Sequence, residues 1–363
     1  MKTLVVFPSQ KAVRVVEAPR PEGPLSAKQV LLRTIDVGIC GTDREIAAFA
    51  YGESPPGQDH LVLGHESIAE VLEVGAKVRG LRPGMLVVPT VRRPCGDASC
   101  VACGADRPDF CVTGRFRERG IKEADGFLCE LFVEDESNLV RVPRALADVG
   151  VLVEPLTIVA KTQSQIRAIQ GRLPWEGSSR RALVLGAGAV GLLAAMMLVA
   201  NDLDTYVYSR EPPDGDRAKL IRGFGATYVS ATDVDVASLG SRVGSVDVVF
   251  EAIGSSPVVF AATSVLAPNG IFVFTGVPSL GLKRSVDLDG IMRDLVLKNQ
   301  VFLGTVNASR RAYETAITEL EQFLGLFPAS VRALIGHRTS IDEAPELLRA
   351  QRGIKDVVHF GRT

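Results

Sequence analysis

The stretch ALVLGAGAVG, residues 182–191, decides the fold of this chain. Its first four residues predict a buried strand, and the apolar residues that continue to Ala200 predict a helix. Gly186 permits a tight turn between them, Gly188 lets a pyrophosphate approach the backbone, and Gly191 lets the helix pack closely on the strand. The N–H groups at the start of such a helix favour phosphate. The predicted dinucleotide-binding residues are Gly186, Gly188, Ala189, Val190 and Gly191. The alternative is a glycine-rich turn that binds no ligand.

Strand-like and helix-like segments alternate after about residue 180. The predicted strands are Ala182–Leu185, Thr205–Tyr208, Thr227–Ser230, Val246–Glu251, Ile271–Thr275 and Val301–Gly304. Their apolar continuity indicates burial on both faces, as in a parallel sheet. Segments such as Val190–Ala200 and Arg217–Phe224 have the length and composition of the intervening helices. We therefore predict an α/β fold with a doubly wound Rossmann domain over residues 176–306.

The first part of the chain has a different sequence pattern, with short β-like runs separated by proline and glycine. Examples of these runs are Gln29–Ile35, Ser67–Glu73 and Met85–Pro89. The pattern predicts a compact β-barrel domain over residues 1–175. The last segment, 307–363, begins with a predicted helix over Arg310–Leu324 and is expected to return to the first domain.

The composition is that of an ordinary globular protein, with 46% hydrophobic and 23% charged residues. The formal net charge of −1 attracts neither nucleic acid nor an anionic membrane, so we expect a small-molecule substrate and neither of those partners. The first apolar stretch, residues 4–7, is too short for a signal peptide, which favours the cytoplasm. Residues 182–200 carry no charge and approach the length of a membrane span, but their glycines favour a strand and a helix instead.

The end of the second predicted strand bears on the choice of nicotinamide cofactor. An acidic residue at this point would bind the ribose of NAD, whereas here Ser209 and Arg210 precede Glu211. A carboxylate would repel a 2′-phosphate, and Ser209 and Arg210 could bind one. We therefore expect NADP use, alone or together with NAD. The alternative is that Arg210 is a solvated loop cation.

Four of the six cysteines lie in one short stretch. They are Cys95, Cys100, Cys103 and Cys111. Four thiolates can close a tetrahedral zinc site that has no open position and that ties down a loop without a core of its own. The alternative is a set of unrelated reduced thiols. Cys129 has no partner motif and is interpreted as a buried apolar residue.

A second candidate metal set is dispersed along the chain. Cys40 lies in VGICGTD, His65 and Glu66 lie in LGHE, and Glu154 lies in EPL. Thiolate, imidazole and carboxylate form a plausible catalytic zinc set with one position left for water or substrate. Spacing alone does not prove this, because a single histidine or glutamate is usually structural.

Taken together, GICGTD, GHE, the four-cysteine loop, EPL and GAGAVG resemble, in order and over nearly the whole chain, the zinc-containing medium-chain alcohol dehydrogenases. GICGTDREI, LVLGHE, RPDFC with a following TG, the DGF near residue 125 and Val306-Asn307 are most similar to the archaeal-type glucose, or aldose, 1-dehydrogenases. The resemblance implies a GroES-like β-barrel as the first, catalytic domain. It also implies a dimer or tetramer built through the last strands near Val301.

The resemblance further implies one catalytic and one structural zinc ion. Cys40 and His65 would bind the catalytic ion. Glu66 and Glu154 would be ligands or near-ligands that exchange during turnover. Glu118, Glu154 and Asn307 would contact the substrate, and Thr305 and Asn307 would contact the cofactor.

In the implied reaction, zinc polarises the substrate oxygen, hydride passes to the nicotinamide, and an aldose becomes a lactone. Thr42 would hydrogen bond to the zinc-held oxygen and begin a proton path. Thr42 also has a structural interpretation, because Thr42-x-x-Glu45 fits a capping box at the start of a short helix. Both roles can coexist.

The chain departs from the glucose dehydrogenase pattern in two ways. The first spacing in the cysteine loop is four residues rather than two. Val91, Ile158 and Leu297 stand where polar sugar contacts are expected, and each unpaired hydroxyl would cost about 1–3 kcal/mol. A different pentose or hexose, a deoxy sugar or a less polar alcohol or polyol therefore stays open. A cofactor-binding protein without chemistry is a third interpretation, against which the intact candidate zinc set argues.

Overall fold

The computed structural model describes residues 1–174, 180–278 and 285–361. The chain divides into two compact units. The first unit comprises Met1–Thr157, Asn307–Glu321 and Leu334–Thr363, and the second comprises Ile158–Val306 and Gln322–Ala333. The division falls inside a continuous helix, α3 (Val153–Gln170), and therefore earlier than the boundary at 175 that the sequence predicts. A helix shows no break in its own pattern where it passes from one core to the next.

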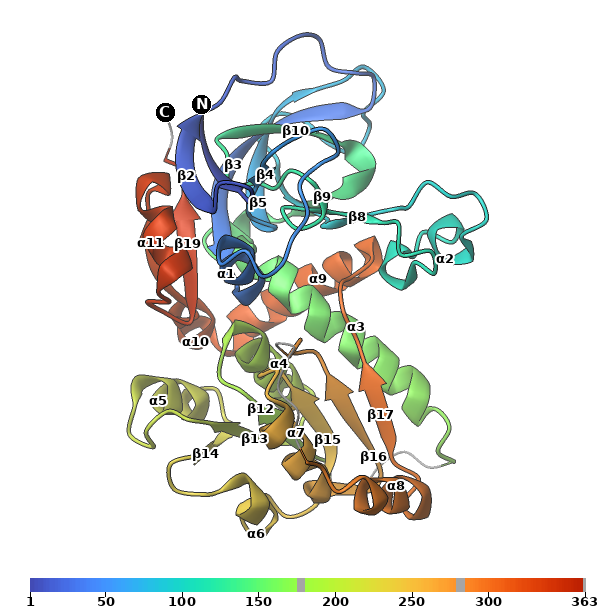
Figure 1. The fold of residues 1–363 in the computed structure, drawn as a ribbon. Helices are drawn as coiled ribbons and strands as arrows, with labels where there is room; N and C mark the ends of the chain where they lie inside the picture. Colours follow the sequence, from blue (N-terminus) through green and yellow to red (C-terminus); the bar gives the residue numbers. More distant parts are fainter. Residues whose placement is uncertain (175–179, 279–284, 362–363) are drawn as a thin grey trace. The chain divides into compact units, whose positions relative to one another are not determined.

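The first unit is built on a β-sheet in the order β11-β6-β5-β3-β19-β18, with β10 also paired to β3. These strands are β3 (Gln29–Ile39), β5 (Glu66–Val74), β6 (Leu86–Pro89), β10 (Leu131–Asp135), β11 (Leu139–Val142), β18 (Ile335–Thr339) and β19 (Lys355–His359). Strand β19, from the end of the chain, lies antiparallel beside β3, with Val357 opposite Gly38 (Figure 1). The C-terminal segment therefore completes the sheet of the first unit.

Two smaller sheets and several short helices surround this sheet. One sheet contains β1 (Lys2–Phe7), β2 (Ala12–Glu17) and β4 (Leu61–Val62), and the other contains β7 (Arg92–Arg93), β8 (Arg117–Arg119) and β9 (Glu123–Ala124). The helices are α1 (Gly41–Ala47), α2 (Val101–Gly104), α11 (Ala344–Arg349) and the first part of α9 (Arg310–Leu326). Alternate residues of β3, including Val30 and Leu32, are buried in the common core.

The second unit contains a six-stranded parallel sheet in the order β14-β13-β12-β15-β16-β17. Its strands are β12 (Arg181–Leu185), β13 (Asp204–Ser209), β14 (Thr227–Ser230), β15 (Val246–Glu251), β16 (Leu266–Phe274) and β17 (Val301–Gly304). Its helices are α4 (Ala189–Ala200), α5 (Asp216–Gly223), α6 (Leu239–Val243), α7 (Ser256–Ala261), α8 (Leu288–Leu297) and α10 (Pro328–Ala333). All six predicted strands are present. Strand β16 begins earlier than predicted because Pro268 and Asn269, which resemble a turn in the sequence, lie within it.

The strand order reverses beside β12, which is the switch point where doubly wound sheets bind ligands (Figure 1). Gly186 adopts φ +108°, which favours glycine, and its N–H donates to the Tyr208 carbonyl at 2.9 Å. A Cβ at Gly191 would overlap the Gly186 carbonyl oxygen, whereas a Cβ at Gly188 would meet no atom within 4 Å. The two glycines thus have different roles: Gly191 allows α4 to pack on the turn, and Gly188 leaves its backbone open to a ligand.

The uncharged run 182–200 forms β12 and α4, separated by the glycine turn. Within the described ranges, no helix has both the length and the apolar character needed to cross a membrane.

Candidate functional site

Two of the predicted metal ligands meet where β3 ends and β5 begins. Cys40 follows β3 directly and begins α1, and His65 immediately precedes β5. The Cys40 Sγ lies 3.2 Å from the His65 Nε2. A carboxylate oxygen of Glu66 lies close to both, since ligand atoms of the three residues are all within 4.8 Å of one another.

Asp43 supports both of these ligands, a role that the sequence analysis missed. One carboxylate oxygen, Oδ2, accepts the Cys40 backbone N–H at 2.9 Å. The other, Oδ1, lies 3.3 Å from His65 Nδ1, although the two atoms are oriented outside hydrogen-bond geometry. Burial alone would raise the pKa of Asp43, but the neighbouring His65 and the bond from Cys40 lower it overall. A carboxylate behind a metal-binding histidine typically orients the ring.

The predicted capping box at Thr42 and Glu45 is wrong. The capping box lies two residues earlier, with Cys40 as the N-cap and with the Asp43 carboxylate accepting the Cys40 backbone N–H. Thr42 is half-buried in the first turn of α1. Its hydroxyl is therefore not committed to capping the helix.

Glu66 forms a buried ion pair that the sequence also did not predict. Lys355 Nζ lies 2.7 Å from Oε1 and 2.5 Å from Oε2 of Glu66, and both side chains are at most 4% exposed. Gly38 provides the space, because a Cβ there would overlap Glu66 Oε2 and approach the Lys355 Cδ. Strand β19 therefore brings a counter-charge to the candidate metal site from the far end of the chain.

Glu154 lies in the first turn of α3 and does not belong to the group of three close ligands. Burial raises the pKa of Glu154 to about 7, with the negative charge of Glu66 adding to the effect and His65 opposing it. The structure thus places Glu154 within electrostatic range of the other candidate ligands rather than in contact with all of them.

The donors present at this site suit zinc. Thiolate sulfur, imidazole nitrogen and carboxylate oxygen are its ordinary protein ligands, and three of them are already close enough to share one ion. The buried and otherwise unpartnered His65 Nδ1 and Asp43 Oδ1 face each other behind this set. Cys40, His65 and Glu66, with Glu154 nearby, are therefore the residues that could hold such an ion.

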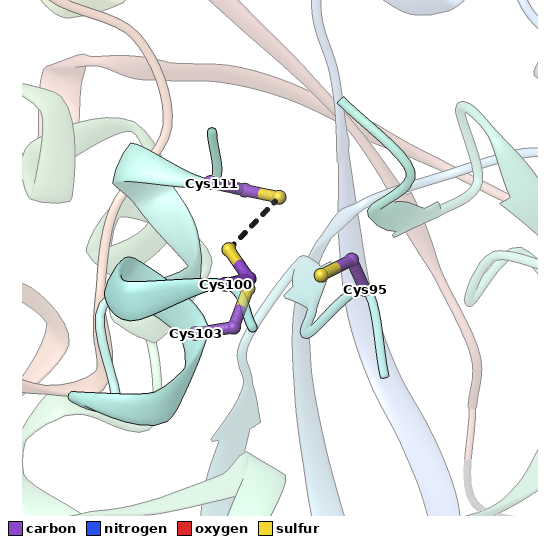
Figure 2. A group of neighbouring side chains, drawn as sticks. All are labelled: Cys95, Cys100, Cys103 and Cys111. Carbon is purple, nitrogen blue, oxygen red and sulfur yellow. Dashed lines mark hydrogen bonds between the residues drawn. The ribbon is translucent and has the colours of Figure 1, made fainter. Parts of the chain in front are cut away.

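The four clustered cysteines also converge. Their sulfur atoms all lie within 4.8 Å of one another, and Figure 2 shows Cys95 facing the other three from across the loop. Backbone N–H groups of Cys103 and Val112 lower the pKa of Cys100 to about 6. The loop has little core of its own, since Val101, Phe110 and Val112 are exposed. The group has the ligand chemistry of a closed, structural zinc site.

The predicted substrate residues Glu118 and Asn307 are in contact within the first unit. Glu118 Oε1 accepts hydrogen bonds from Arg92 Nε at 3.0 Å, Arg92 Nη2 at 2.9 Å and Asn307 Nδ2 at 2.6 Å. Among the residues that the structure describes, no group hydrogen bonds to Oε2, and this atom is not among the buried unpartnered ones. The Arg92 guanidinium in turn stacks on Phe116, 3.7 Å from the ring centroid. One acceptor oxygen of Glu118 is therefore held open.

The predicted cofactor residues of the second unit surround the switch point. Ser209 ends β13, with its hydroxyl 3.1 Å from that of Tyr228, and Arg210 follows as an exposed side chain. Arg217, which the sequence analysis did not single out, pairs with Glu211 at 3.0 Å and reaches the Ala187 carbonyl. Arg217 thereby offsets the acidic charge of Glu211 beside the glycine turn.

The remaining residues at positions of expected cofactor or sugar contacts are divided between the two units. Thr305 belongs to the second unit and accepts a hydrogen bond from Gln165 at 3.0 Å. Val91 belongs to the first unit and is 1% exposed. Ile158 and Leu297 belong to the second unit, and Leu297 is exposed on α8.

Replacing Lys355 by methionine should destabilise the protein by about 3–5 kcal/mol, because Glu66 would be buried without its counter-charge. The double variant Lys355→Met, Glu66→Gln should recover part of that loss, since no unpaired charge stays buried. Urea unfolding of the purified proteins measures both free energies. Equal stabilities of the single and double variants would contradict the assignment.

Two family models together cover almost the whole chain. One, described as "Glucose dehydrogenase C-terminus", matches residues 147–360, and the other, "Alcohol dehydrogenase GroES-like domain", matches residues 26–144. A glucose 1-dehydrogenase of Methanocella arvoryzae is 35% identical over 99% of this chain and 100% of its own length. A second, from Vulcanisaeta moutnovskia, is 39% identical over 95% of both chains.

The structural comparison agrees with these matches. A Haloferax mediterranei glucose dehydrogenase, solved in complex with NADP, Zn and gluconolactone, superposes with a TM-score of 0.90 at 32% identity over 100% of both chains. The first unit corresponds to a GroES-like domain and the second to a Rossmann domain. The chain belongs to the glucose dehydrogenase family within the zinc-containing medium-chain alcohol dehydrogenases.

Proposed function

We propose that this protein oxidises the anomeric hydroxyl of an aldose to a lactone, with zinc and NADP. The observation that carries the proposal is the convergence of Cys40, His65 and Glu66 on one point. The relatives named glucose 1-dehydrogenase and the Haloferax complex with NADP, Zn and gluconolactone support the same activity.

Cys40 and His65 would hold the catalytic zinc, with Glu66 or Glu154 as a further ligand. The bound ion supplies a Lewis acid that polarises the substrate hydroxyl and lowers its pKa. When NADP⁺ is bound, its nicotinamide would accept the C1 hydride, and Thr42 would pass the hydroxyl proton to water, so that lactone, NADPH and a proton would be formed. Asp43 keeps His65 and the Cys40 backbone in place throughout.

Glu118 would position the sugar. Its open Oε2 would accept a hydrogen bond from a ring hydroxyl, while Arg92 and Asn307 hold Oε1 and orient the carboxylate. The segment that carries Glu118 packs against the turn before His65, because Gly120 lies against the Gly64 carbonyl. A second candidate substrate is a less polar alcohol or polyol. The buried, apolar Val91 favours it, because it offers no hydrogen bond to a hydroxyl.

A substrate panel tests the function. The purified protein with NADP should oxidise at least one aldose, with a lactone as the first product and activity that is lost with chelator and restored by zinc. Absorbance of NADPH at 340 nm and hydroxamate trapping of the lactone measure the two products. Turnover of simple alcohols or polyols with no aldose oxidised would contradict the proposal.

Two cysteine variants provide a matched control for that experiment. Cys40→Ser should abolish turnover and remove one of two zinc ions per chain. Cys100→Ser should also remove one ion, but should act mainly by lowering the thermal midpoint, since its site ties down a loop. Metal analysis, activity and calorimetry separate the two effects.

The surroundings of the switch point favour NADP. Arg210 is exposed beside Ser209, and the nearby Glu211 forms an ion pair with Arg217 that offsets its negative charge. Arg210→Ala should therefore raise the KM for NADP about tenfold or more and change the KM for NAD by less than twofold. Steady-state kinetics with each cofactor measures this, and equal effects on both would exclude a 2′-phosphate role for Arg210.

We also propose that two copies associate through the second unit, as part of a dimer or tetramer. Strand β17 is an edge of the parallel sheet, and the adjoining helix α8 exposes Leu288, Met292, Val296 and Leu297. An unpaired edge strand and an exposed apolar helix face both favour association with a second copy of the chain. A cluster of four cysteines that could share one metal ion further favours a reducing compartment such as the cytoplasm.

Charge on α8 should break this association. Met292→Glu together with Val296→Glu should at least halve the mass found by light scattering, because two carboxylates would be buried between subunits. Leu326→Glu, an exposed site at the end of α9, serves as the control and should leave the mass unchanged. An unchanged mass in the α8 variant would contradict this interface.

A further inference from the structure

Tyr51 is a large aromatic side chain, 55% exposed, on the loop that follows α1. Backbone hydrogen bonds and close packing hold this loop against its neighbours. Gly52 adopts φ +90°, and a Cβ there would come within 3.0 Å of the Ile46 side chain. The Glu53 N–H donates to the Ile121 carbonyl at 2.9 Å, and the Glu123 N–H donates back to the Glu53 carbonyl at 2.9 Å. Tyr51 is therefore displayed on a fixed backbone.

The segment to which this loop is bonded is the one that carries Glu118. The Glu118 carbonyl accepts hydrogen bonds from the N–H groups of Ile121 and Lys122, at 3.1 and 2.9 Å, and Lys122 forms a β-bridge with Glu53. Tyr51 and Glu118 therefore extend from neighbouring backbone segments. Burial raises the pKa of the Tyr51 phenol, and the charge of Glu118 adds to that increase, as expected for two side chains in the same environment.

The same two segments border the candidate metal site. The helix before Tyr51 begins at Cys40, and Gly120 packs against the carbonyl of Gly64, the residue before His65. Three chain segments thus meet here, bringing a metal ligand pair, an open carboxylate oxygen and an exposed aromatic ring into one region of the first unit.

We propose that the Tyr51 ring forms the apolar wall of the substrate subsite opposite Glu118 and that it is a specificity-determining residue for pyranose substrates. The inference rests on the proposed function. A pyranose presents hydroxyls at its edge and C–H groups on its faces, so a site that binds it needs an acceptor for the edge and an apolar surface for a face. Glu118 Oε2 supplies the first, and an aromatic face, with its negative quadrupole, suits C–H groups.

The residues near Glu118 increase the expected contribution of the Tyr51 ring to sugar affinity. Val91 is buried and apolar and offers no hydroxyl partner. Arg92 and Asn307 are already committed to Glu118 Oε1. With fewer polar contacts available in the first unit, a larger share of the affinity for a sugar falls on apolar contact with the ring.

Kinetics of Tyr51→Ala and Tyr51→Phe with zinc-loaded protein, glucose, xylose and 2-deoxyglucose test the proposal. Tyr51→Ala should raise the KM of each aldose that the wild type oxidises about tenfold, with kcat and the KM for NADP within twofold of wild type. Tyr51→Phe, which keeps the ring, should have a KM within twofold of wild type. Leu326→Ala is the surface control and should change none of these values.

These measurements distinguish failure of the proposed function from failure of the role inferred for Tyr51. A wild-type protein that oxidises no aldose overturns the proposed function, and this inference with it. Wild-type aldose oxidation with an unchanged aldose KM in Tyr51→Ala overturns this inference alone. So does a Tyr51→Phe variant as impaired as Tyr51→Ala, because the hydroxyl rather than the ring would then be responsible. An unchanged KM for NADP in Tyr51→Ala confirms that the variant is folded.

Discussion

The buried ion pair between Glu66 and Lys355 is the constraint on which the rest of the structure depends. Neither charge could be buried alone without a penalty of several kcal/mol, so the strand after His65 and the last strand of the chain must come together. Gly38, on the strand between them, leaves the space that the pair occupies. This contact fixes the returning C-terminal strand to the first unit beside a candidate metal ligand.

Several acidic side chains surround the Glu66–Lys355 ion pair, and they affect how readily this region can bind a metal ion. The carboxyl groups of Asp43, Glu66 and Glu154 lie near two basic side chains, Lys355 and His65. The pKa of about 7 at Glu154 reflects the cost of adding another negative charge to a buried and already acidic region. A divalent cation held by Cys40, His65 and Glu66 would add positive charge beside these carboxyl groups.

Features set by short stretches of chain could be predicted from the sequence. The six strands of the parallel sheet, the glycine turn and the cysteine loop each depend on neighbouring residues. The ion-pair partner of Glu66 could not be predicted from the sequence, because Lys355 lies 289 residues away and no local pattern marks it. The capping error at Thr42 has a different cause. Thr-x-x-Glu matches the usual motif, whereas Cys40 is an unusual N-cap that lies beside His65 and Glu66, where it could bind a metal.

Two glutamates in the first unit are paired with cations in different ways, and the difference bears on the roles proposed for them. The planar guanidinium of Arg92 directs two N–H groups at one oxygen of Glu118 and leaves the other open to a ligand. The ammonium of Lys355, a compact point charge, lies within hydrogen-bond distance of both oxygens of Glu66. Any ion that binds Glu66 must therefore compete with Lys355, whereas a hydroxyl that binds Glu118 displaces no protein group. The geometry of each cation therefore leaves one acceptor oxygen of Glu118 open, whereas both oxygens of Glu66 already have a partner.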